Sequence, residues 1–106
     1  KLDLDISHFY VEGADVEYSV NLCAPHSVMV HIKDGVIEEG KVKYCLPGEG
    51  TIDIPGFISS LRHNGIGNLP IYAEISVQQS ANINYAPWQT AQFCFDTLDS
   101  ARSQTV

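Results

Sequence analysis

Alternation of apolar and polar residues predicts three β-strands in this chain. The three stretches are residues 2–6 (LDLDI), 27–33 (SVMVHIK) and 70–77 (PIYAEISV). In such a strand, successive side chains point to opposite faces of the sheet. Each predicted strand therefore has one apolar face, which should meet helices. Its other face carries polar or ionisable groups.

Apolar residues at helical spacing follow each predicted strand. Asp15 is a suitable N-cap for a helix that ends near Ala24-Pro25, and Asp53 is a suitable N-cap for one that Gly65 closes. A last helix begins at Pro87. The Gly-rich connection 34–52 has room for a small hairpin, VI against KVKY, and a polar loop, QQSANINY, precedes the last helix.

The predicted order is β-α-β-α-β-α in a chain of 106 residues, which suits a single domain. Strands that alternate with helices indicate an α/β fold, with parallel strands and right-handed crossovers. The sequence thus predicts three consecutive βα units with the helices outside the sheet.

Each polar strand face offers one group that can bind a cation: Asp5, His31 and Glu74. Neighbouring parallel strands keep these faces aligned, so we expect the three side chains to converge. Two carboxylates and an imidazole form a sensible ligand set for Mn²⁺, Mg²⁺, Co²⁺ or Zn²⁺. The alternative is that each polar face simply meets water.

Other polar motifs carry weaker signals. His8 follows Asp5 as D-x-x-H, at the end of the strand where parallel α/β proteins keep their chemistry. His26, in a turn, and His63, in the last turn of a helix, are interpreted as structural. The GEG sequence at 48–50 suits either an anion site or a plain turn.

Composition narrows the function classes. The net charge is −7, and only six Lys and Arg residues are scattered along the chain. This balance disfavours nucleic acid as a partner. No apolar run approaches the roughly 18–20 residues of a membrane span, and no secretion signal is visible. The three cysteines show no CxxC spacing, which is typical of reduced thiols in a cytoplasmic protein.

Three segments, taken in order, resemble a known family. They are DISHFYVEGADVEYSVNLCAPHSVMVHIKDG, LPGEGTIDIPGFISSLRHNGI and PIYAEISV. They are similar to the carboxyl-terminal part of sugar phosphate isomerases and epimerases, which are xylose isomerase-like (β/α)8 TIM barrels. The resemblance implies that residues 1–106 form a single partial domain, corresponding to the sixth, seventh and eighth βα units. The predicted ligand is a small-molecule sugar or sugar phosphate.

The resemblance also implies roles for particular residues. Asp5, His31 and Glu74 correspond to metal ligands, and Glu74 corresponds to one member of an acid/base pair that moves a proton through an enediolate. His8 corresponds to a substrate-binding residue. Lys33 and Asp34, just beyond the metal histidine, are expected to touch the substrate or support the ligands.

The chain departs from the family pattern in length. A complete barrel has eight βα units and about 250 residues. The glutamate that would supply the fourth metal ligand and the second acid/base group lies on an earlier strand of the family. We therefore expect the isolated chain to be inactive. The endonuclease IV branch of the superfamily adds a D-x-H motif before GEG, and VKYCLPGEG lacks it. Sugar chemistry is thus favoured over DNA repair.

The alternative function is self-association without catalysis. Three parallel strands have two open edges and an uncovered inner face. The chain is then a non-catalytic barrel fragment or self-associating module. We expect a homo-oligomer, or pairing with the missing part of the barrel.

Overall fold

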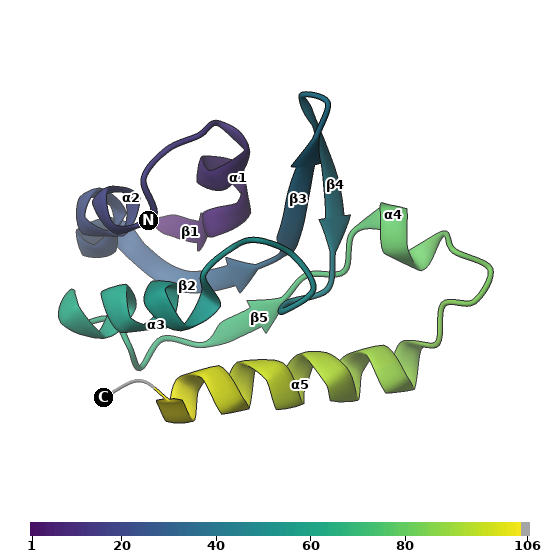
Figure 1. Ribbon diagram of the computed structural model, residues 1–106. Helices are drawn as coiled ribbons and strands as arrows, with labels where there is room; N and C mark the ends of the chain where they lie inside the picture. Colours follow the sequence, from purple (N-terminus) through teal and green to yellow (C-terminus); the bar gives the residue numbers. More distant parts are fainter. Residues whose placement is uncertain (105–106) are drawn as a thin grey trace.

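A computed structural model describes residues 1–104 of the chain (Figure 1). The elements, in chain order, are β1 (Leu2–Asp5), α1 (Ile6–Val11), α2 (Val16–Cys23), the 3₁₀ helix η1 (Ala24–His26), β2 (Ser27–Ile32), β3 (Asp34–Glu38), β4 (Lys41–Cys45), α3 (Ile54–His63), β5 (Ile71–Ala73), α4 (Val77–Ser80) and α5 (Pro87–Gln104).

The main sheet has three parallel strands in the order β1-β2-β5. In the β1–β2 ladder Asp5 pairs with His31, and in the β2–β5 ladder His31 pairs with Tyr72. The predicted α/β class and the parallel pairing of the three strands are therefore confirmed. β2 is the central strand, and β1 and β5 are the two edges.

The hairpin expected within residues 34–52 is also confirmed. β3 and β4 pair antiparallel, and Glu38 and Lys41 form the last pair before the turn. The two turn residues, Glu39 and Gly40, have φ values of 50° and 75°. Positive φ at both central positions matches the twist of the two strands, and Gly40 adopts it without steric cost. The hairpin projects away from the main sheet in Figure 1.

Both predicted N-caps are present. The Asp15 carboxylate accepts a hydrogen bond from the Tyr18 N–H at 2.8 Å, and the Asp53 carboxylate accepts one from the Gly56 N–H at 3.0 Å. Each bond satisfies an N–H group that the first turn of a helix leaves unpaired. These local signals explain why α2 and α3 begin where the sequence predicts.

Two short α-helices, α1 and α4, were not predicted from the sequence. The predicted strand 2–6 ends at Asp5, where α1 begins. The predicted strand 70–77 narrows to β5 (Ile71–Ala73), because Ser76 caps α4 through the Gln78 N–H. α4 packs on β4, where Gln78 accepts a hydrogen bond from the Tyr44 N–H at 2.7 Å.

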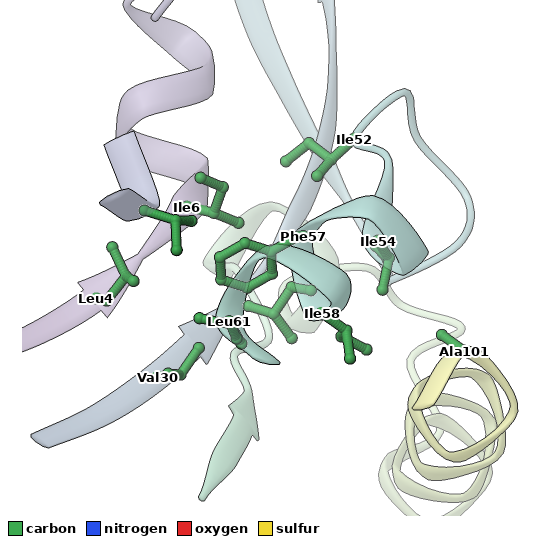
Figure 2. Packing of buried hydrophobic residues seen from close by; sticks show 11 residues of the cluster. Leu4, Ile6, Val30, Ile52, Ile54, Phe57, Ile58, Leu61 and Ala101 are labelled. Carbon is green, nitrogen blue, oxygen red and sulfur yellow. The ribbon is translucent and has the colours of Figure 1, made fainter. Parts of the chain in front are cut away.

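One apolar core lies between the main sheet and α3. Leu4 of β1 and Val30 of β2 point toward Phe57 and Leu61 of α3, and all four side chains are buried (Figure 2). Their burial removes apolar surface from water at roughly 25 cal/mol per Å². α2 and α5 flank α3 and contact it on either side. The predicted apolar faces of β1 and β2 thus meet α3 through Leu4 and Val30, whereas Val28 at the start of β2 is 47% exposed.

The opposite face of the main sheet has less cover. Tyr72 of β5 is 47% exposed, whereas Ile32 and Val30 of the adjacent strand are fully buried on the core side. Of the helices between residues 1 and 104, none combines the length and the apolar character that crossing a bilayer demands. The polar groups singled out in the sequence lie on and around this less covered face.

Candidate functional site

The candidate site lies where the three parallel strands end. Asp5 is the last residue of β1 and is paired in register with His31, near the end of β2. Glu74 follows β5 directly, and its N–H donates to the Ile32 carbonyl of β2 at 2.9 Å. The backbone therefore brings Asp5, His31 and Glu74 to the carboxyl-terminal ends of the three strands.

His31 makes its hydrogen bond with Asp3, a residue that the sequence analysis did not select. Nδ1 of His31 lies 2.7 Å from Oδ1 of Asp3. The imidazole stacks on the Tyr72 ring, with the ring centroids 5.5 Å apart and the ring planes 30° from parallel. His31 is thus held between the two edge strands, by a carboxylate on β1 and an aromatic ring on β5.

Asp5 supports the local fold. Its Oδ1 accepts hydrogen bonds from the Ser7 N–H at 2.9 Å and from the Ser7 hydroxyl at 2.7 Å, so Asp5 is the N-cap of α1. The other oxygen, Oδ2, lies 3.5 Å from Nε2 of His8. Asp5 is buried, whereas the His8 side chain is 70% exposed.

Glu74 pairs with Lys33. The Lys33 ammonium lies 3.4 Å from Oε1 of Glu74 and sits over the Tyr44 ring, 4.4 Å from the ring centroid. The Lys33 side chain is 10% exposed, whereas that of Glu74 is 45% exposed. A carboxylate and an aromatic ring thus surround a largely buried cation, which is a favourable setting for it.

Asp34 is buried, and its carboxylate accepts hydrogen bonds from four backbone N–H groups. Its Oδ1 accepts hydrogen bonds from the N–H groups of Gly35 and Ile52, and its Oδ2 accepts them from Gly48 and Gly50. The GEG turn therefore wraps around the Asp34 carboxylate. A Cβ at Gly50 would collide with that carboxylate, so this close approach requires glycine.

The three predicted metal ligands do not form a coordination group. Within residues 1–104, no cluster of three His, Cys, Asp or Glu side chains is arranged to hold a metal ion. The donor types suit a divalent cation, but each group is committed elsewhere: His31 to Asp3, Asp5 to Ser7, and Glu74 to Lys33.

An apolar cleft of about 410 Å³ lies between β5 and α5. Its apolar lining comes from both elements and includes Ile71, Ala73, Cys94, Phe95 and Leu98. Phe95 is 65% exposed at the cleft, and Trp88, about two helical turns earlier in α5, is 86% exposed. The β5 edge beside the cleft pairs with no other strand between residues 1 and 104.

Cys23, Cys45 and Cys94 are free thiols, as the spacing predicts. Burial raises the pKa of the Cys45 thiol to about 11, and the nearby charges of Asp34 and Glu49 add to this effect. Burial also raises the pKa of Cys94. Both groups are therefore poor nucleophiles at neutral pH.

One signal in the sequence pointed to Asp3. It lies two positions before Asp5, and alternation places both carboxylates on the same strand face. Tyr72 occupies the matching position on β5, directly opposite His31. Asp5 is the N-cap of α1, and its Oδ1 is bonded to Ser7. Asp3 is therefore the carboxylate that binds His31.

Neither a protein-family model nor a curated protein sequence matches this chain.

Proposed function

We propose that this chain is the carboxyl-terminal part of a divalent-metal-dependent sugar or sugar-phosphate isomerase or epimerase. In this proposal, residues 1–106 are three consecutive βα units of a (β/α)8 barrel. The observation that carries it is the parallel order β1-β2-β5, which brings Asp5, His31 and Glu74 to the carboxyl-terminal ends of the strands. Active sites of such barrels lie at the carboxyl-terminal ends of the strands.

The two carboxylates and the imidazole can bind a cation at these strand ends after their side chains rearrange. Glu74 is nearly half exposed and makes one ion pair, so its carboxylate can turn from Lys33 toward His31. Asp5 would keep its bonds to Ser7 through Oδ1 and offer Oδ2. A cation bound there would polarise neighbouring oxygens of a sugar.

Glu74 is the proposed proton acceptor. Its carboxylate is the most exposed of the three predicted ligands, and it makes a single ion pair, with Lys33 at 3.4 Å. In this proposal His8, whose side chain is 70% exposed beside Asp5, binds a sugar hydroxyl. Asp34 supports the site from behind by fixing the turn at 48–50. Proton transfer needs a second group on the other face of the sugar, so we expect the isolated chain to be inactive.

The chain's charge and thiols fit this setting. Its net charge of −7 favours a small-molecule substrate over nucleic acid. Three free cysteines are in keeping with a reducing, cytoplasmic environment.

Calorimetric titration with Mn²⁺ tests the proposal. We expect the wild-type chain to bind the ion and the His31→Ala variant to lose at least about tenfold in affinity, because one ligand is removed. His63→Ala, at the exposed end of α3, is the matched control and should bind like wild type. Equal affinity in His31→Ala and wild type would refute the proposed metal site.

A self-associating module is the second candidate. The exposed apolar cleft between β5 and α5 favours it, since Phe95 lines the cleft and is 65% exposed beside the open edge of β5, and Trp88 of the same helix is 86% exposed. Exposed apolar surface that is contiguous in this way is a common feature of interaction sites. Either a second copy or the rest of a barrel would cover the cleft.

A further inference from the structure

We propose that Asp3 is a positioning residue that fixes His31 in the tautomer with the proton on Nδ1. Nε2 is then left as the lone pair that can bind a divalent cation. The part concerning the cation rests on the proposed function, whereas the part concerning the tautomer stands on the contacts alone.

The chemistry of the 2.7 Å contact between Asp3 Oδ1 and His31 Nδ1 sets the tautomer. A carboxylate only accepts hydrogen bonds, so Nδ1 must donate. In a neutral imidazole the other nitrogen then carries no proton. The donor direction therefore follows from the partner's identity.

The sheet holds both partners in place. Asp3 pairs in register with Met29, so its side chain reaches His31 diagonally, two positions further along β2. Tyr72, opposite His31 on β5, stacks against the ring. A carboxylate on one neighbouring strand and an aromatic ring on the other fix the ring's rotation about its side-chain bonds.

Nε2 of His31 is the donor that this arrangement leaves available. Between residues 1 and 104, the hydrogen bond of the imidazole is made through Nδ1, and the side chain is 26% exposed. Asp5 and Glu74 both engage other partners. A carboxylate on the far nitrogen also strengthens a histidine as a metal donor, and loss of such a partner typically weakens metal binding 10–100-fold.

Nitrogen-15 NMR of the His31 ring tests the tautomer directly. Two-bond nitrogen–proton correlations, recorded at alkaline pH, distinguish the protonated from the unprotonated ring nitrogen. We expect Nδ1–H in wild type, retention of Nδ1–H in Asp3→Asn, whose amide oxygen still accepts, and a shift toward Nε2–H in Asp3→Ala. Asp96→Asn removes the same charge from exposed α5 and should leave the ring unchanged. An Nε2–H ring in wild type, or an unchanged ring in Asp3→Ala, overturns the proposal.

Calorimetry with Zn²⁺ alone tests the consequence. We expect Asp3→Ala to bind zinc at least about tenfold more weakly than wild type, with Asp3→Asn between them and Asp96→Asn unchanged. Equal zinc affinity in Asp3→Ala and wild type overturns the positioning role. An Nδ1–H ring in a wild-type chain that binds no zinc supports the tautomer assignment and refutes the proposed metal function, so the two failures are distinguishable.

Discussion

Replacement of Asp34 by asparagine should strongly destabilise the chain. The carboxylate is buried and accepts four backbone hydrogen bonds, two on each oxygen. An asparagine keeps one oxygen and puts an NH₂ group in place of the other. The pair of N–H groups that faced the lost oxygen, from Gly48 and Gly50 or from Gly35 and Ile52, then meets a donor.

The magnitude follows from that count of lost bonds. A hydrogen bond to a charged group is worth about 1.5–3 kcal/mol, and a buried donor left unpaired costs a similar amount. Loss of two such bonds at Asp34 therefore predicts a fall of about 3–6 kcal/mol in the free energy of unfolding. Domains of this size have roughly 5–15 kcal/mol in total, so the variant should be marginally folded.

Urea denaturation followed by circular dichroism measures this fall in the free energy of unfolding. The midpoint should move to lower urea while the slope stays constant, and the melting temperature should drop by about 12 °C or more. Asp15→Asn is the matched control, because the same atoms change and asparagine caps a helix as well as aspartate does. A fall below about 1 kcal/mol in Asp34→Asn would refute the assignment of Asp34 as the anchor of the turn.

Three further outcomes are expected. The Cys45 thiol has a folded-state pKa of about 11. Its stabilising effect is thus fully present below the unfolded pKa of about 8.5 and lost as the pH rises through the folded pKa. Its carboxymethylation rate, followed by mass spectrometry, should keep rising to about pH 11, and a plateau near pH 9 contradicts this. Phe57→Ala should lower the free energy of unfolding by about 3–5 kcal/mol in denaturant titrations. A loss under about 1.5 kcal/mol would show that the core collapses into the cavity left by the Phe57 ring. Phe95→Glu should abolish concentration-dependent association in light scattering, whereas Ile83→Glu, in an exposed loop, should not. A wild-type chain that stays monomeric over the whole concentration range contradicts the docking role of the cleft.

Much of the fold follows from local signals in the sequence. Strand alternation and the Asp15 and Asp53 caps predict β2, α2 and α3 to within a residue or two, because each signal acts over only a few positions. α1 could not be predicted in this way. Its six residues are too few to show helical periodicity, and Ile6 continues the strand alternation as well as it begins a helix.

The candidate site is only partly readable from the sequence. Placing His31 beside Asp5 needs only parallel pairing, which the order of elements predicts. Side-chain partners depend on competition instead. Asp5 is occupied by the α1 cap, which leaves Asp3 to bind His31, and Lys33 reaches Glu74 across strands. Such choices are decided by tertiary contacts that no single stretch of sequence contains.

The β3–β4 hairpin has a consequence for the order of folding. Its strands are joined by a two-residue turn, so its ladder closes a very short loop. The main sheet instead joins Leu2 to Ser27 and Val30 to Ile71, which brings together distant parts of the chain. Hairpins form in about 1–10 μs, while distant pairings must first overcome loop-closure entropy. Protection of backbone amides from hydrogen exchange should therefore appear first in the hairpin, and only later in the parallel strands that carry the site.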